Sequence, residues 1–134
     1  MIRVARIDHL VLRSANVPAM VRFYEGVLGC RVERSLPPQT GLTQLRAGDA
    51  LIDIVAVDSA LGRAGGGPPG RAGNNLDHLC LQLEPLGQHE LRGWLEAHGV
   101  ACGEFETRYG ASGFGPSVYI TDPDGNTVEL RGAV

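Results

Sequence analysis

Apolar and polar residues alternate along the chain in two recognisable periods, and the order of these periods occurs twice. Residues 7–13 alternate as in a strand, and apolar residues at helical spacing follow between Asn16, a suitable helix cap, and Gly29, a suitable helix end. Further strand-like runs occupy residues 30–36, 43–47 and 51–57. The first half therefore predicts a strand, a helix and three strands.

The second half repeats this order. A strand-like run at residues 76–83 precedes a helix that contains Leu91, Trp94 and Leu95 and ends at Gly99. Strands are predicted at residues 100–106, 117–121 and 127–131, with the glycine-rich residues 109–116 as a loop and residues 122–125, Asp-Pro-Asp-Gly, as a tight turn. We therefore expect an α+β fold of two tandem βαβββ modules.

The predicted organisation is a single domain over residues 1–134. Module one spans residues 1–60 and module two spans residues 76–134. Residues 61–75 are rich in glycine and proline, which predicts a flexible surface linker. No Gly-Lys-Ser/Thr follows these glycines, so the linker is not a phosphate-binding loop of the Walker type.

Composition narrows the class of protein. The chain has 134 residues, of which 43% are hydrophobic and 20% charged, as in one globular domain. A net charge of -3 without a basic cluster argues against nucleic acid and anionic membranes as partners. Three cysteines without ligand-like spacing, and an N-terminus without a signal-peptide core, favour a cytoplasmic location.

One histidine and one carboxylate lie within apolar strands of each module. His9 and His78 occupy matching first strands, and Asp53 and Glu129 lie between apolar neighbours in matching fourth strands. A buried unpaired carboxylate is costly, whereas a divalent metal compensates its charge and also binds neutral imidazole. This donor set predicts one divalent transition metal (nickel, zinc, cobalt, manganese or iron) in preference to calcium or magnesium.

Each residue alone has an ordinary structural explanation. A single strand histidine is more often a hydrogen-bonded core or edge residue, Glu129 alone could face solvent, and Asp53 could pair with an arginine. The metal interpretation depends on the same pattern occurring in both modules. In this metal interpretation, the two histidines face inward and Asp8 and Asp77 are their outward partners.

The whole chain resembles the vicinal oxygen chelate superfamily, which includes glyoxalase I, fosfomycin-resistance proteins, epimerases, extradiol dioxygenases and bleomycin-binding proteins. The resemblance rests on residues 8–29, 76–83 and 115–130. It implies that the first and fourth strands of each module are neighbours and that the modules form a cup-shaped mixed sheet around one metal. His9, His78 and Glu129 match ligand positions, and Asp53 stands where glyoxalase I has glutamate.

The resemblance also implies an activity. We expect a metal-dependent lyase or isomerase of the glyoxalase I type that binds vicinal oxygens of a small substrate, with Glu129 as the catalytic proton shuttle. Arg13 matches an arginine that glyoxalase I uses to bind a glutathione carboxylate, or is an exposed strand-end residue. Cys80 and Tyr119 are candidate substrate-binding residues, with simple packing as the alternative.

Several alternatives remain open. Val57 stands where bacterial glyoxalase I has asparagine, and the chain contains no lysine, which argues against glutathione or another thiol as cofactor. Ser117 and Tyr119 match a Ser-x-Tyr motif of the fosfomycin thiol transferases. An epimerase, a dioxygenase and an antibiotic-binding resistance protein also fit the resemblance. Superfamily members are commonly homodimers, and the site could form within one chain or between two.

Overall fold

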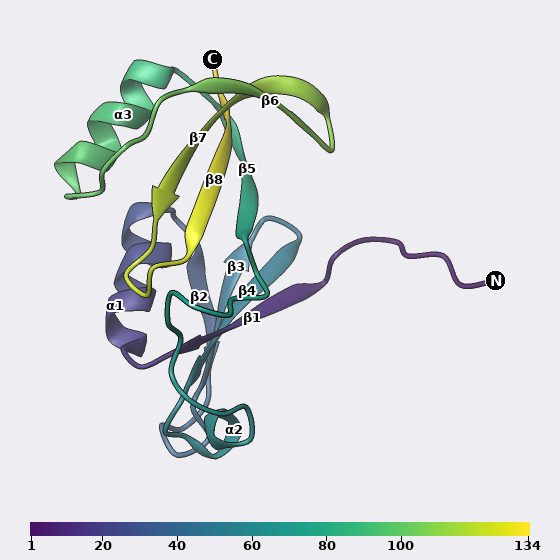
Figure 1. Cartoon of the computed structure of the whole chain (residues 1–134), viewed down its shortest axis with the longest axis vertical. Coiled ribbons are helices and arrows are strands. Elements are labelled where there is room, and N and C mark those ends of the chain that lie inside the picture. The colour runs from purple at the N-terminus through teal and green to yellow at the C-terminus, as the bar shows by residue number, and fades with distance from the viewer. The chain divides into compact units, whose positions relative to one another are not determined.

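The computed structural model describes residues 1–134 and divides into two compact units, Met1–Gly70 and Arg71–Val134 (Figure 1). Each unit contains one four-stranded mixed sheet with the same strand order and the same pairing. The predicted α+β fold of two tandem βαβββ modules is confirmed.

The first unit has the sheet order β1-β4-β3-β2, in which β1 runs parallel to β4 and the other pairs are antiparallel. The side chain of Asn16 accepts a hydrogen bond from the backbone of Ala19, so the predicted helix start is confirmed. The helix continues as a π-helical turn and ends before Gly29, whose positive φ of 72° suits glycine. The elements are β1 His9–Ser14, α1 Val17–Val21, η1 Arg22–Val27, β2 Arg31–Ser35, β3 Leu42–Ala47, β4 Ala50–Ala56 and α2 Ala60–Arg63.

The second unit has the equivalent sheet order β5-β8-β7-β6, again with the first and last strands parallel. Its elements are β5 His78–Leu86, α3 Gln88–Ala97, β6 Glu106–Gly110, β7 Gly113–Thr121 and β8 Thr127–Ala133. None of the helices in either unit is long and apolar enough to cross a bilayer.

The sequence-based prediction was wrong for the strand at residues 100–106. The chain there is irregular up to Phe105, and β6 begins only at Glu106. The carbonyl oxygens of Cys102 and Gly103 accept hydrogen bonds from the side chain of Arg92, and the Gly103 amide donates one to the carbonyl oxygen of Tyr119 on β7. The glycine-rich residues 109–116, predicted as a loop, instead form the tip of the β6–β7 hairpin.

The linker also differs from the expectation at its start. Residues 60–63 form the short helix α2, because the Ser59 side chain accepts a hydrogen bond from the backbone of Gly62 at 3.1 Å. The Gly62 position is closely packed: a Cβ there would lie 1.8 Å from the carbonyl oxygen of Ala56. The chain after β4 is therefore ordered locally before the remaining glycine- and proline-rich residues.

Alternation along the strands separates two faces of each sheet. In the first unit, Leu45, Ile52 and Ile54 are buried on the face toward α1, which packs against β4. In the second unit, the buried residues of β7 and β8 at alternate positions are Val118, Ile120, Val128 and Leu130. Because side chains alternate, Asp53 and Glu129 each lie on the face of their own sheet that is opposite to these buried apolar residues.

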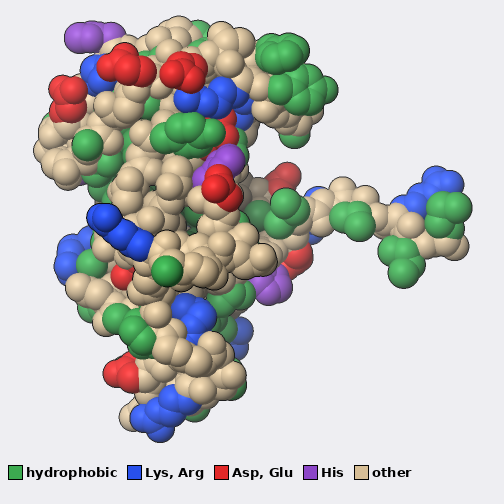
Figure 2. All heavy atoms as spheres, viewed as in Figure 1, with side chains coloured by type: hydrophobic (Ala, Val, Ile, Leu, Met, Phe, Trp, Pro, Cys, Tyr) green, Lys and Arg blue, Asp and Glu red, His purple; other side chains and the backbone are tan.

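On the face drawn in Figure 2, arginine and acidic side chains are interspersed with hydrophobic and neutral residues.

The β7–β8 turn depends on one buried carboxylate. Asp122 is 4% exposed and accepts hydrogen bonds from the backbone of Asp124 at 3.0 Å, the backbone of Asn126 at 2.9 Å and the side-chain amide of Asn126 at 2.8 Å. These bonds hold the turn that connects β7 to β8, the strand that carries Glu129.

We expect Asp122→Ala to lower the free energy of unfolding by about 2 kcal/mol or more, because three donors lose their acceptor in a buried turn. Asp49→Ala, in the exposed β3–β4 turn, is the matched control and should change it by less than about 0.5 kcal/mol. Urea denaturation measures both variants. Equal losses for the two variants would contradict this account of the turn.

Candidate metal-binding half-sites

The first half-site consists of His9 and Asp53 in the first unit. The parallel register of β1 and β4 pairs Val11 with Asp53, so His9 lies two positions away along the same face. Asp53 is 3% exposed, and its Oδ2 accepts a hydrogen bond from Gln44 Nε2 at 3.1 Å. Its Oδ1 is buried and has no hydrogen-bond partner. A nearly buried carboxylate with one unsatisfied oxygen is the arrangement that a bound cation would complete.

His9 is fixed by the residue before it. Its Nδ1 lies 2.6 Å from Asp8 Oδ1, and this hydrogen bond raises the pKa of His9 and lowers the pKa of Asp8. With Nδ1 bonded to a carboxylate, Nε2 is the nitrogen left for a further ligand. This confirms the predicted pairing of Asp8 with His9.

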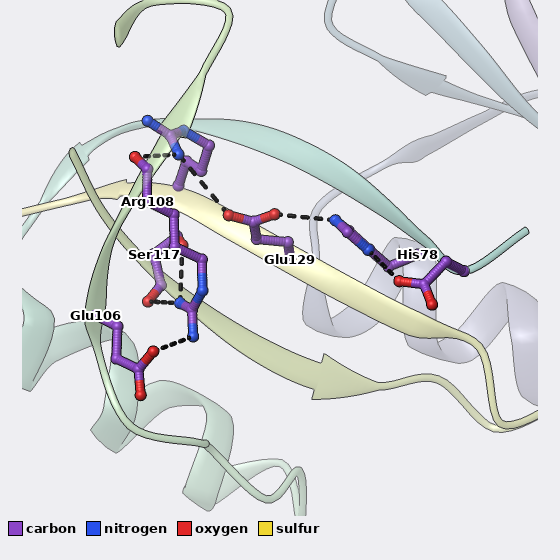
Figure 3. Close-up of polar contacts among 7 residues, drawn as sticks. His78, Glu106, Arg108, Ser117 and Glu129 are labelled. Atoms are coloured by element: carbon purple, nitrogen blue, oxygen red, sulfur yellow. Dashed lines mark hydrogen bonds and ion pairs between the residues drawn. The ribbon is translucent and has the colours of Figure 1, made fainter. Parts of the chain in front are cut away.

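The second half-site consists of His78 and Glu129 in the second unit (Figure 3). His78 Nδ1 lies 2.7 Å from Asp77 Oδ2, which repeats the aspartate–histidine contact of the first unit. His78 Nε2 lies 3.2 Å from Glu129 Oε2, so the imidazole and the carboxylate of this half-site face each other. Glu129 is 6% exposed, and its Oε1 is buried without a hydrogen bond.

Glu129 has cationic neighbours that Asp53 lacks. Arg131 Nη1 lies 3.7 Å from Glu129 Oε1, and Arg108 binds the carbonyl and hydroxyl oxygens of Ser117 at 2.8 and 3.0 Å beside it (Figure 3). Burial alone would raise the pKa of Glu129. The Ser117 hydroxyl and the electrostatic effects of His78, Arg108 and Arg131 outweigh burial and lower this pKa.

Two predicted substrate-binding residues lie beside Glu129. Cys80 on β5 and Tyr119 on β7 are its direct cross-strand neighbours, one on each side. The Tyr119 ring meets the His78 ring edge-on with centroids 5.4 Å apart, and the Arg108 guanidinium lies 4.3 Å from the Tyr119 ring centroid. Cys80 is exposed as a residue, but desolvation of its thiol and the neighbouring Glu129 carboxylate raise its pKa to about 11.

The third predicted substrate-binding residue, Arg13, is bound to its own chain. Its guanidinium donates hydrogen bonds to the carbonyl oxygens of Gly62 at 2.9 Å, Gly67 at 3.1 Å and Gly66. Gly65 also packs closely on it, since a Cβ there would lie 2.0 Å from Nη1. Arg13 therefore fastens the start of the linker to β1.

Three polar residues of the half-sites were not anticipated from the sequence: Gln44, Arg108 and Arg131. Two had a usable signal. Arg131 follows Glu129 by two residues and so shares its face, and Gln44 lies opposite Asp53 across the short β3–β4 turn. Arg108 had none, because its strand was placed too early in the chain.

Neither unit alone brings together three or more histidine, cysteine, aspartate or glutamate side chains in a metal-binding group. Each offers one imidazole and one buried carboxylate on a βαβββ module. A duplicated module of this kind defines the vicinal oxygen chelate fold. The chain belongs to the Glyoxalase/Bleomycin resistance protein/Dioxygenase superfamily, whose family model matches residues 6–130.

Solved structures agree with this assignment. An integron cassette protein of V. cholerae is 27% identical, with a TM-score of 0.75 and coverage of 98% of this chain and 97% of that chain. A virulence protein of Salmonella typhimurium is 26% identical, with a TM-score of 0.71 and coverage of 99% and 100%. A lactoylglutathione lyase of Agrobacterium tumefaciens is 23% identical, with a TM-score of 0.68 and coverage of 96% and 93%. No protein of curated function matches the sequence.

The raised pKa of Cys80 has a measurable consequence. At pH 8, a thiol with a pKa of about 11 should react with iodoacetamide roughly a hundredfold more slowly than one with the ordinary value of 9.0, because the thiolate is the nucleophile. Glu129→Gln should speed the reaction by removing a negative charge. Rates are measured by mass spectrometry in a Cys30→Ala, Cys102→Ala background. A Cys80 that reacts as fast as a free thiol would contradict this description of its surroundings.

Proposed function

We propose that this protein is a divalent-metal-dependent enzyme of the glyoxalase type that acts on a small oxygenated substrate. The supporting observation is the same in both units: a nearly buried carboxylate has one oxygen without a hydrogen bond, near a histidine whose Nδ1 is already bonded. Family membership and the fold shared with a lactoylglutathione lyase are consistent with this proposal.

The residues present fit a divalent transition metal. His9, Asp53, His78 and Glu129 would hold it, with two half-sites needed to complete four ligands, from one chain or from two copies. Asp8 and Asp77 would orient the two imidazoles, as carboxylate partners of ligating histidines do. When bound, the metal would supply Lewis-acid polarisation of adjacent substrate oxygens.

The remaining roles belong to side chains around Glu129. Its carboxylate is the candidate proton shuttle at the substrate carbon, because Oε1 is not committed to a hydrogen bond. The Tyr119 hydroxyl, on the neighbouring strand, would donate to a substrate oxygen, and Cys80 would contact substrate as a neutral thiol. Arg13 would bind a substrate anion only if the linker carbonyls release its guanidinium.

We expect purified protein to bind one divalent transition metal per set of four ligands, measured by elemental analysis and isothermal titration calorimetry. His9→Ala and His78→Ala should each weaken binding at least tenfold, because each removes one ligand. His89→Ala, a histidine of α3 outside both half-sites, is the matched control and should bind as the wild type does. Absence of stoichiometric metal under all loading conditions would refute the proposal.

The reaction class is tested separately. The metal-loaded protein should isomerise the methylglyoxal–glutathione adduct, or a thiol-free 2-oxoaldehyde analogue if glutathione is not recognised. Glu129→Gln should lower kcat by two orders of magnitude or more, as expected for loss of a general base. A metal-loaded protein inactive on both compounds across several divalent metals would contradict the isomerase proposal and leave metal binding intact.

One observation favours a second candidate function, sequestration of a small molecule without catalysis. His78 and Arg131 both contact the Glu129 carboxylate without any metal, so Glu129 has polar partners within its own unit. Bleomycin is the suitable probe. Chelator-treated protein that binds bleomycin as tightly as metal-loaded protein would support this candidate over the enzyme.

A further inference from the structure

Arg131 extends from the buried carboxylate to the β6–β7 hairpin. It is 8% exposed, and its guanidinium donates hydrogen bonds to the carbonyl oxygens of Arg108 at 3.0 Å and Gly113 at 2.8 Å. The same Nη1 lies 3.7 Å from Glu129 Oε1. The side chain therefore starts on β8, passes over β7 and reaches β6. Its hydrogen bonds hold the guanidinium charge beside Glu129.

The glycines of the hairpin make room for this guanidinium. A Cβ at Gly110 would lie 2.8 Å from Arg131 Cζ, and a Cβ at Gly115 would lie 3.4 Å from its Nη2. The glycine-rich stretch is thus explained as a cover built around a buried cation. A buried arginine with its donors on carbonyls is held in place and does not move away easily when its neighbour changes.

The two half-sites differ in this respect. Asp53 receives a hydrogen bond from the neutral amide of Gln44, whereas Glu129 lies between the imidazole of His78 and the guanidinium of Arg131. A positive charge this close stabilises the carboxylate and also opposes a second positive charge that approaches the same oxygens. Arg131 and a metal ion therefore act on Glu129 in the same way.

We propose that Arg131 is an internal counter-ion that stabilises Glu129 in the metal-free protein and competes with the metal for this carboxylate. The inference rests on the proposed function, in which Glu129 is a ligand. Thermodynamic linkage makes the competition reciprocal: the part of the Arg131–Glu129 interaction that is lost when the metal binds is subtracted from the affinity for metal. Arg131 would then set how tightly the second half-site holds its metal.

The test compares Arg131→Met with Arg131→Lys. Both lose the pair of bonds to the Arg108 and Gly113 carbonyls, but only methionine loses the positive charge. We expect Arg131→Met to bind nickel on the order of tenfold more tightly than the wild type in calorimetry, and to gain a larger increase in melting temperature on nickel addition. Arg131→Lys should bind nickel within about threefold of the wild type.

The outcomes separate this inference from the proposed function. A wild type that binds no metal refutes the proposed function itself. A wild type that binds nickel, with an Arg131→Met affinity that is unchanged or weaker, overturns only the counter-ion role. If Arg131→Met does not fold without metal, Arg131→Gln replaces it, and folding restored by nickel supports the proposal. Variants that stay unfolded with nickel would show that Arg131 is only a structural anchor.

Discussion

The negative charge of a carboxylate buried in an apolar strand must be compensated. In each module, the sheet face that carries the carboxylate is organised around that requirement. Ile52 and Ile54 bury one face of β4, so alternation turns Asp53 to the other face, and Val128 and Leu130 do the same for Glu129. The hydrophobic core thus determines on which face of the sheet each carboxylate lies. Because burying that charge is costly, polar partners are needed around the carboxylate.

The repeated module places a buried carboxylate at the equivalent position of each unit, but the residues around the two carboxylates differ. Directly across from the carboxylate, the first unit has Val11 and Gln44, whereas the second has Cys80 and Tyr119. Glu129 is in addition flanked by His78 and Arg131, so its charge is balanced within its own unit. Asp53 has only a neutral hydrogen-bond donor and an unsatisfied oxygen. In the proposed metal site, the first half-site would therefore depend more than the second on the metal to balance its charge.

Sequence alone could predict what local periodicity and turn chemistry determine. The repeat, the Asn16 cap, the Asp122 turn and the faces of His9, His78 and Glu129 followed from residue order. Contacts made by long side chains across strands could not be predicted this way. Arg92 bonds to the carbonyl oxygens of Cys102 and Gly103, β6 begins only at Glu106, and Arg108 therefore lay outside the predicted strand. The bonds from Arg13 to the linker carbonyls could not be predicted either, because Gly62 and Gly67 lie far from Arg13 in the sequence.

In the proposed site both histidines bind the same metal, and X-ray absorption spectroscopy of the nickel-loaded protein counts the imidazole ligands per nickel. We expect multiple-scattering features of two imidazoles per nickel in the wild type. We expect one imidazole in His9→Ala and one in His78→Ala, with oxygen ligands making up the remainder. A wild-type spectrum with fewer than two imidazoles, or one that neither substitution changes, would show that the two histidines do not share a metal.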